Sequence, residues 1–256
     1  MPADPTNRLR RQRSCKRRSL VIMSVAQNVA RVHEAMRAAA RRAGRDENQV
    51  ALMAVSKTHP PEQILEAHAA GLRLFGENRV QEFAAKSDAL GNLTGARWHM
   101  IGHLQTNKAA RAAELFAAVD SVDSLKLAER LDSAARELGK KLRVLIEINI
   151  GDETAKSGIA PDSRELETLL GEAGKLGHLE FCGLMTIPPF REDPQQARPY
   201  FRRLRVLRDQ MAARKPAGVG LETLSMGMSH DFEVAIEEGS TCVRLGTAIF
   251  GERLKP

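Results

Sequence analysis

The sequence predicts an α/β protein that folds as a single (β/α)8 TIM barrel. Its 256 residues suit one such barrel. Short aliphatic runs alternate with amphipathic helical stretches along the chain, which is the pattern of repeated β–α units. The runs are apolar at successive positions, as strands buried on both faces of a parallel sheet must be. A doubly wound open sheet is the alternative that this pattern leaves open.

The elements are expected in a regular order. A first helix is predicted over 24–43, because apolar residues recur at helical spacing before Gly44. Eight strands are predicted at 50–56, 72–76, 97–101, 117–122, 142–150, 179–187, 222–226 and 241–250. Helices are predicted between them, near 61–70, 78–90, 105–115, 124–139, 161–176, 194–214 and 231–238. No Pro- or Ser-rich linker and no internal repeat divides the chain, so residues 23–256 are expected to form one barrel.

Most of the chain's positive charge lies at its N-terminus. The formal net charge is +7, and residues 1–22 hold seven arginines and lysines against Asp4 alone. Basic tails of this kind can bind nucleic acid or anionic lipid without sequence preference. We favour a disordered extension, or a start codon assigned too early, because Met23 opens the first helical pattern. No specific nucleic-acid partner is therefore expected.

Targeting signals and cysteines point to a cytoplasmic protein. The apolar stretch 20–23 is short for a secretory signal, and cleavage after Ala26 would damage the first helix. No apolar run is long enough to span a membrane. Cys15, Cys182 and Cys242 lie far apart without CxxC spacing, which supports neither a disulfide framework nor a zinc site. No metal site is expected, and the last two cysteines are expected to be buried thiols in a reducing compartment.

Polar residues gather where the expected strands end, which is the functional end of a barrel. The first strand ends in Lys57, after the apolar run 51–55. A lysine near a barrel interior is desolvated, so its pKa falls and its amine can form Schiff bases with carbonyls. Lys57 could equally leave the strand and point into solvent, and the local sequence does not decide between the two.

The last two strand ends combine glycines with hydroxyl groups. The residues are Ser225, Gly227, Ser229, Gly246 and Thr247. Glycines let backbone N–H groups approach a ligand closely, and barrels often bind phosphate after strands 7 and 8. Two ordinary Gly/Ser loops would look the same in sequence, since neither stretch is a P-loop or a GxGxxG motif.

Longer stretches resemble the YggS/PROSC family of pyridoxal 5′-phosphate (PLP) homeostasis proteins, which is related in fold to the barrel domain of bacterial alanine racemase. They include AVSKT at 54–58, FGENRVQE at 75–82 and LSMGMSHDF at 224–232. The other matching stretches are 98–108, 148–158, 183–189 and 243–251. The matches occur in family order and cover about residues 24–252, so residues 1–22 lie outside the resemblance.

The resemblance implies a fold type III PLP protein with the cofactor on Lys57 as an internal aldimine. It implies that Ser225 or Ser229, with Gly246 and Thr247, holds the phosphate. The full set of cofactor-binding residues that it implies is Lys57, Asn78, His99, Met185, Ser225, Met226, Gly227, Ser229, Arg244, Gly246 and Thr247.

Arg244 would face the pyridine nitrogen, where its cation disfavours protonation of the ring and weakens the cofactor as an electron sink. It could instead pair with a carboxylate on the rim.

Several other polar residues have two readings. Asn78 and His99 would line the cofactor ring or its O3′ side. Asn78 could instead cap the following helix, and His99 could be a packing histidine. Glu77 and Glu82 are expected to cap a helix or to pair with Arg79.

The resemblance and the sequence both favour a cofactor-handling protein over a catalyst. A racemase needs two acid/base groups on opposite faces of the cofactor, and the only tyrosine, Tyr200, lies in a helical stretch. We therefore expect a monomer that holds, buffers or delivers PLP, with PLP-dependent apo-enzymes as recipients. A low-activity PLP-dependent amino-acid racemase or lyase is the alternative.

Overall fold

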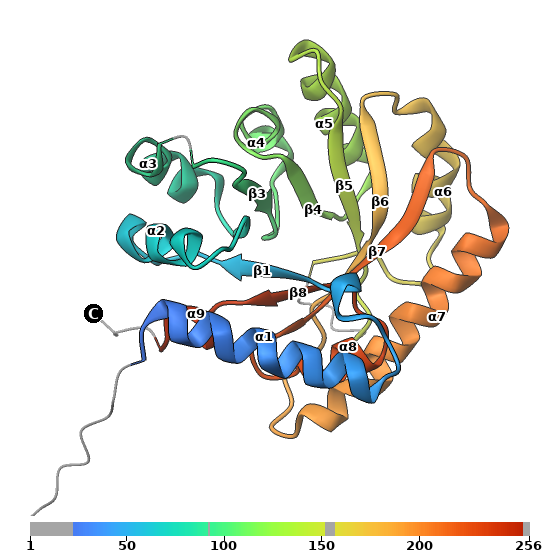
Figure 1. The fold of residues 1–256 in the computed structure, drawn as a ribbon. Helices are drawn as coiled ribbons and strands as arrows, with labels where there is room; N and C mark the ends of the chain where they lie inside the picture. The colour runs from blue at the N-terminus through green and yellow to red at the C-terminus, as the bar shows by residue number, and fades with distance from the viewer. Residues whose placement is uncertain (1–22, 92, 152–156, 253–256) are drawn as a thin grey trace, which may run out of the picture.

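The computed structural model describes residues 23–91, 93–151 and 157–252, and it confirms the predicted barrel. Eight parallel strands close in sequence order, with helices around them (Figure 1). The last strand pairs with the first, from Ala51 opposite Cys242 to Ala54 opposite Leu245, so the open-sheet alternative is wrong. The predicted basic extension lies outside the described residues.

The elements follow the predicted alternation. The strands are β1 (Ala51–Val55), β2 (Leu74–Glu77), β3 (Arg97–Met100), β4 (Ala118–Val122), β5 (Leu142–Glu147), β6 (Leu179–Met185), β7 (Val219–Met228) and β8 (Cys242–Leu245). The α-helices are α1 (Val25–Arg42), α2 (Pro61–Ala69), α3 (Val80–Leu90), α4 (Ala109–Leu115), α5 (Leu125–Glu137), α6 (Arg164–Glu172), α7 (Arg198–Arg214), α8 (Phe232–Glu237) and α9 (Thr247–Phe250).

The last predicted strand, 241–250, is too long. Strand β8 ends at Leu245, and the following apolar residues form the short helix α9 instead. Ile249 and Phe250 are buried because α9 packs against α1. A short buried helix and a buried strand have the same apolar composition, so the sequence could not separate them.

The fifth predicted strand, 142–150, is also too long. Strand β5 ends at Glu147. Ile148 donates its N–H to the Met185 carbonyl of β6 at 2.8 Å and forms an isolated bridge with Ile159. Glu147, rather than the residues after it, is therefore the strand-end side chain of β5.

Helix α1 belongs to the outer helix layer, where it packs against α2, α8 and α9 (Figure 1). Its start is fixed by a capping box, in which the Ser24 hydroxyl accepts from the Gln27 N–H and the Gln27 side chain accepts from the Ser24 N–H. Asn28 Nδ2 donates to the Ile249 carbonyl at 2.9 Å and ties α1 to α9. Its buried apolar residues have the predicted helical spacing; they are Val25, Val29, Val32, Met36, Ala39 and Ala40.

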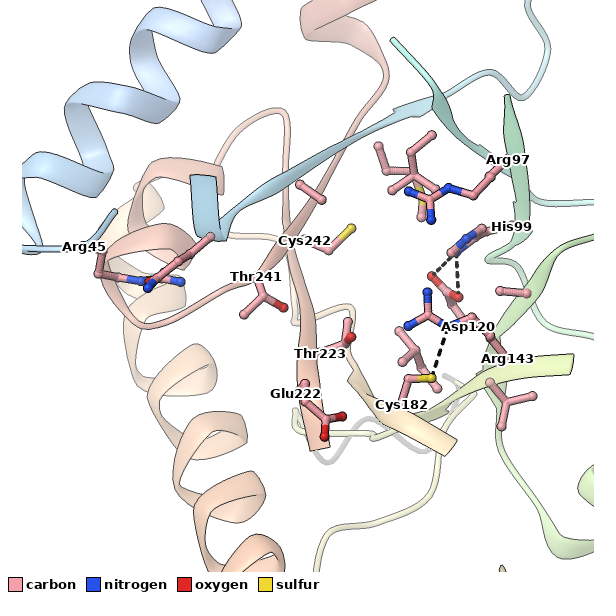
Figure 2. Close-up of a pocket in the computed structure, with 17 residues that line it drawn as sticks. Arg45, Arg97, His99, Asp120, Arg143, Cys182, Glu222, Thr223, Thr241 and Cys242 are labelled. Carbon is pink, nitrogen blue, oxygen red and sulfur yellow. Dashed lines mark hydrogen bonds and ion pairs between the residues drawn. The ribbon is translucent and has the colours of Figure 1, made fainter. Parts of the chain in front are cut away.

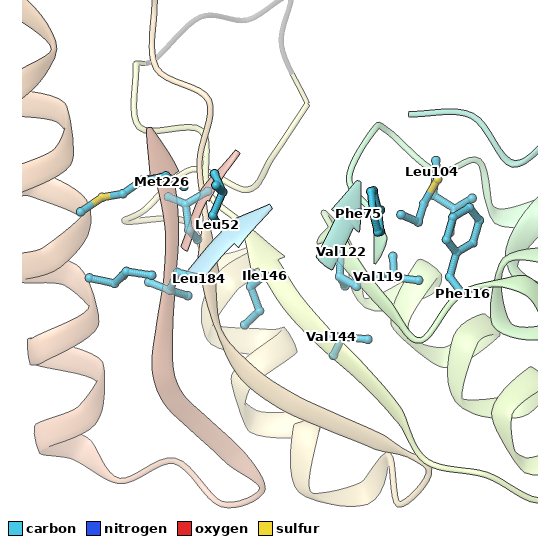
Figure 3. Packing of buried hydrophobic residues seen from close by; sticks show 14 of the residues in the cluster. Leu52, Phe75, Leu104, Phe116, Val119, Val122, Val144, Ile146, Leu184 and Met226 are labelled. Atoms are coloured by element: carbon cyan, nitrogen blue, oxygen red, sulfur yellow. The ribbon is translucent and has the colours of Figure 1, made fainter. Parts of the chain in front are cut away.

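The main apolar core lies between the barrel and its helices. Side chains such as Leu52, Phe75 and Ile146 point outward from the strands into this layer (Figure 3). Smaller separate clusters lie apart from it; they are Met53, Val55, Ile101 and Cys242, and Leu145, Cys182 and Met185. Because side chains alternate along a strand, these clusters come from the faces that point into the barrel.

The two described cysteines are buried free thiols, as predicted. Burial raises the pKa of Cys242 to about 12. Within the described ranges, no helix carries an apolar stretch of the length needed to cross a bilayer.

Candidate functional site

Lys57 lies just past the carboxyl end of β1, as predicted. Met53 and Val55 belong to the cluster inside the barrel. Because side chains alternate along a strand, Lys57 is the next position on the inward face. The residue is partly buried. These observations favour the inward orientation over the solvent-facing one.

Strand register brings neighbouring strand ends to one rim. Val55 pairs with Gly76, so Lys57 and Asn78 each lie two residues beyond a paired position. On the other side of β1, strand β8 ends one residue before Gly246. Residues from β1, β2 and β8 therefore meet at the carboxyl end of the barrel, which is the end predicted to carry function.

The turn after Lys57 has a strained backbone. Thr58 has φ +64°, a left-handed conformation that β-branched residues rarely adopt. Its N–H donates to Glu82 Oε1 on α3, and the His59 N–H donates to the Ser56 carbonyl at 3.1 Å. Strain held by surrounding bonds is common where a side chain must be aimed at a ligand.

A buried ion pair lies directly behind this turn. Lys86 Nζ is 2.6 Å from Glu77 Oε1 and donates to the Ser56 carbonyl at 3.0 Å. The Ser56 hydroxyl donates to the same carboxylate oxygen at 2.6 Å. Burial raises the pKa of Glu77, while Lys86 and Ser56 oppose that rise. The predicted pairing of Glu77 and Glu82 with Arg79 is wrong, because both carboxylates lie against Lys86.

Asn78 carries a buried acceptor that has no donor. Its predicted alternative role as a helix cap is wrong, since Arg79 is the N-cap residue of α3 and no side chain caps that end. Asn78 Oδ1 is buried and has no hydrogen-bond partner among the described residues. Such a group costs about 1–3 kcal/mol. A bound polar ligand that donates a hydrogen bond would remove this cost.

Arg244 is almost completely buried inside the barrel. Its Nη1 donates to the Ser225 carbonyl at 2.7 Å and to the Ser225 hydroxyl at 2.8 Å, and its Nη2 donates to the Thr186 carbonyl at 2.7 Å. No described carboxylate lies within ion-pair distance of it, so the alternative of a rim salt bridge is wrong. Burial lowers the pKa of Arg244, but an arginine remains charged in such a site.

The structure separates the two candidate phosphate serines. Ser225 is fully buried in β7, and its hydroxyl accepts from Arg244. The Ser229 hydroxyl instead accepts from the N–H groups of Gly246 and Ala248, each at 3.2 Å. Two backbone N–H groups therefore converge at Ser229, which is the arrangement that an oxyanion needs.

The remaining predicted residues, which are Met185, Met226, Gly227 and Thr247, differ in burial and in what they contact. Met185 ends β6, fully buried in one of the small clusters, and pairs in register with Ser225. The side chain of Met226 packs in the outer core, so only its backbone can face the barrel interior. Gly227 has φ +97°, and a Cβ there would lie 2.5 Å from the Ala235 Cβ, so its role is to shape the turn. Thr247 is exposed at the start of α9.

His99 does not lie at the strand ends. It is the third residue of β3 and lines a cavity at the opposite, amino end of the barrel (Figure 2). Its Nδ1 is 3.0 Å from Asp120 Oδ1 on β4. The assignment of His99 to the cofactor stays a prediction, and the geometry groups it with a different set of side chains.

Glu147 is a rim residue that the sequence did not indicate. It ends β5 almost fully buried, accepts from the Ser157 hydroxyl at 2.9 Å, and leaves Oε2 without a described partner. Burial raises its pKa, and the nearby charge of Arg244 opposes that rise. The available signal was its position at the end of a strand, which was hidden because the strand was predicted to run three residues further.

The rim fits a phosphorylated carbonyl compound. Lys57 offers an amine, Ser229 marks two converging N–H groups, and Asn78 offers an unpartnered acceptor. Arg244 supplies a fixed buried cation beside them. This donor and acceptor set matches the aldehyde, phosphate and ring hydroxyl that the resemblance assigns to the site.

Comparison with known proteins gives consistent matches. Residues 27–254 match the family described as alanine racemase, N-terminal domain. A pyridoxal phosphate homeostasis protein of Aquifex aeolicus is 46% identical over 231 residues, covering 90% of this chain and 99% of that protein. The structure of PipY of Synechococcus elongatus with PLP bound has a TM-score of 0.78 and 37% identity, covering 89% of this chain and 100% of PipY. An alanine racemase of Clostridium difficile, at 16% identity and a TM-score of 0.67, shares the fold over 57% of its own length.

Proposed function

Because the chain belongs to the family of pyridoxal phosphate homeostasis proteins, whose barrel is that of the alanine racemase N-terminal domain, we propose that it binds PLP at the carboxyl end of the barrel. The protein then serves PLP homeostasis by holding, buffering or delivering the cofactor. The observation that carries the proposal is that Lys57, the unpartnered acceptor of Asn78 and the N–H pair at Ser229 share one rim.

Each rim residue has a role in this proposal. The Lys57 amine holds the cofactor covalently, and Asn78 accepts a hydrogen bond from it. Ser229 and Gly246 hold the phosphate. PLP supplies an aldehyde for the lysine and, when its ring is protonated, an electron sink. Arg244 places a cation at the ring nitrogen and disfavours that protonation, which favours storage over carbanion chemistry.

The same geometry argues for a carrier rather than a racemase. A racemase needs acid/base groups on both faces of the cofactor. Tyr200 lies on α7 in the outer layer, where its hydroxyl accepts from Arg191 at 3.0 Å. Glu147, buried with a raised pKa, is the one observation that favours a low-activity PLP-dependent amino-acid racemase or lyase instead.

Trapping the cofactor tests the proposal. Purified protein is expected to be yellow, and borohydride is expected to fix a pyridoxyl group on the peptide that contains Lys57. Lys57→Ala is expected to abolish both signals, because no other amine follows the inward face of β1. Lys126→Ala, which changes an exposed lysine on α5, is the matched control and is expected to retain both. A colourless protein that PLP cannot reconstitute contradicts the proposal.

An assay of amino-acid enantiomer exchange separates the carrier from the enzyme. The carrier predicts no turnover above that of free PLP. Turnover that disappears in both Lys57→Ala and Glu147→Gln would replace the carrier proposal with the racemase or lyase alternative.

Replacing Ser229 tests the phosphate site. Ser229→Ala is expected to weaken PLP binding about fivefold, the equivalent of one hydrogen bond of about 1 kcal/mol. Ser225→Ala is expected to act chiefly on stability, because its hydroxyl accepts from buried Arg244. Absorbance titration with PLP and thermal unfolding measure the two effects. The assignment fails if Ser225→Ala weakens PLP binding more than Ser229→Ala does at an unchanged melting temperature.

The wider setting of the protein also belongs to this proposal. The buried free thiols of Cys182 and Cys242 support a reducing, cytoplasmic compartment. A monomer and PLP-dependent apo-enzymes as recipients complete the proposal; gel filtration and cofactor transfer to a defined apo-enzyme test them.

A further inference from the structure

A cavity lies at the amino end of the barrel, whereas Lys57 follows the carboxyl end of β1. Figure 2 shows the side chains that line this cavity. Its volume is about 430 Å³, which is the size of a small-molecule site. The residues that open five of the strands line it; they are Ala51, Leu74, Arg97, Ala118 and Cys242. This position separates it from the proposed cofactor site, because the two lie at opposite ends of the same strands.

Positive charge exceeds negative charge in this cavity. Arg45, Arg97 and Arg143 line it, against the carboxylates of Asp120 and Glu222. Clefts lined by excess charge of one sign attract ligands of the other sign. The cavity therefore selects for anions.

Two of these arginines have guanidinium groups available to a ligand. Arg97 makes no side-chain hydrogen bond or ion pair with any residue that the structure describes. Arg143 uses Nε, which lies 3.3 Å from Cys182 Sγ and 4.0 Å from Glu180 Oε2. Arg45, in contrast, donates to two backbone carbonyls.

The carboxylate between Arg97 and Arg143 is already engaged. The three side chains come from the neighbouring strands β3, β4 and β5, and Figure 2 shows the two guanidinium groups on either side of Asp120. Asp120 is 2% exposed, and His99 Nδ1 lies 3.0 and 3.3 Å from its two oxygens. Arg143 also has the Glu180 carboxylate 4.0 Å from its Nε, whereas Arg97 has no ion pair with a described residue. Arg97 therefore supplies the uncompensated positive charge for a ligand.

The inner wall of the cavity is apolar. Met53, Leu145 and Cys242 are buried members of the small clusters inside the barrel and line this space. A ligand with one oxyanion and an apolar body would place its charge at the arginines and its body on this wall. Planar guanidinium groups bind carboxylate and phosphate oxygens through paired hydrogen bonds.

We propose that the amino-end cavity binds a small organic anion, with its carboxylate or phosphate held by Arg97 and Arg143 and its apolar part against Met53, Leu145 and Cys242. The site is separate from the cofactor rim and does not depend on the proposed function. Arg97 and Arg143 then bind a ligand at the amino end of the barrel, the end that in barrels of this kind usually serves stability.

Calorimetric titration with three probes of similar size tests the proposal. Benzoate and phenyl phosphate carry the two oxyanions on one apolar body, and benzamide is the neutral counterpart. The titrations use full-length protein that has been treated with PLP and borohydride, so that a phosphate probe does not compete at the Lys57 rim. At least one anion is expected to bind at least tenfold more tightly than benzamide, and which one binds better identifies the oxyanion.

Matched arginine variants locate the site. Arg97→Gln and Arg143→Gln are each expected to weaken anion binding about tenfold, because each removes a charge-assisted contact. Arg111→Gln removes an exposed arginine that pairs with Glu114 on α4 and is expected to leave binding unchanged. Circular dichroism confirms that each variant is folded. Absence of anion binding, equal binding of benzamide, or equal losses in all three variants overturns the proposal.

Discussion

Replacing Lys86 with methionine is expected to lower the free energy of unfolding by about 3–5 kcal/mol, because it leaves Glu77 buried without its cation. Glu77 is fully buried, and Lys86 Nζ lies 2.6 Å from its Oε1. The variant also loses the bond to the Ser56 carbonyl, which holds the turn that presents Lys57. Weaker PLP binding is therefore expected along with the loss of stability. Chemical unfolding and PLP titration measure the two effects.

The loss of stability in this variant is expected to depend on pH. Burial raises the pKa of Glu77, and Lys86 opposes that rise. Without Lys86 the pKa rises further, so the folded state keeps a proton that the unfolded state releases, and stability falls as pH rises. The deficit relative to wild type should be largest at neutral pH. It should shrink below the ordinary glutamate pKa, where Glu77 is protonated in both states.

Two controls accompany the Lys86 experiment. Lys126→Met changes an exposed lysine on α5 and is expected to alter stability by less than about 0.5 kcal/mol. Adding Glu77→Gln to Lys86→Met removes the buried charge and should restore most of the lost stability. If the double variant is no more stable than the single one, the uncompensated charge of Glu77 is not the cause.

Replacing Gly183 with alanine is expected to destabilise the barrel by more than about 4 kcal/mol, which lies at the extreme of single-substitution effects. Gly183 lies in β6 with φ +152°. A Cβ added there would collide with the Thr223 carbonyl oxygen of β7 and lie 2.7 and 2.9 Å from the Thr223 carbonyl carbon and Cα. These atoms belong to the backbone of a neighbouring strand, so they cannot move aside without breaking the pairing of β6 with β7.

Gly171→Ala is the matched control for this prediction. Gly171 lies in α6, and a Cβ there would meet nothing within 4 Å. Alanine is expected to be neutral or to stabilise the protein by up to about 1 kcal/mol. Thermal and chemical unfolding compare the two variants. An equal melting temperature for both would contradict the close approach of β6 and β7.

The strand ends show how far sequence reasoning reaches into the site. Lys57, Asn78 and Gly246 were placed on the functional rim because each follows an apolar run, and strand register puts them there. The same reasoning missed Glu147, since the apolar residues after it look like a continued strand although β5 ends at Glu147. An apolar run indicates that its residues are buried, but it does not indicate whether they belong to a strand, a helix or a loop.

Partner choice was decided by tertiary contacts. Glu77 was expected to cap a helix or to pair with the nearby Arg79, yet it binds Lys86 on α3. Ser225 and Ser229 were equivalent in sequence, and only their contacts separate them: Ser225 binds Arg244, whereas Ser229 accepts from the Gly246 N–H. Such pairings depend on which side chains lie close together in the folded chain, and the separation of two residues in the sequence does not predict that.

By itself, the sequence determined the alternation of apolar strands with amphipathic helices and the lysine after the first strand, because these are local features. Closure of the sheet into a barrel was decided by the pairing of β8 with β1. Only the tertiary structure decided which end of the barrel each inward side chain serves. Lys57 reaches the carboxyl rim, whereas His99 joins Arg97 in the cavity at the amino end. The physical reason is that strands in a closed barrel are staggered against one another, so the level of a residue depends on its register with its neighbours.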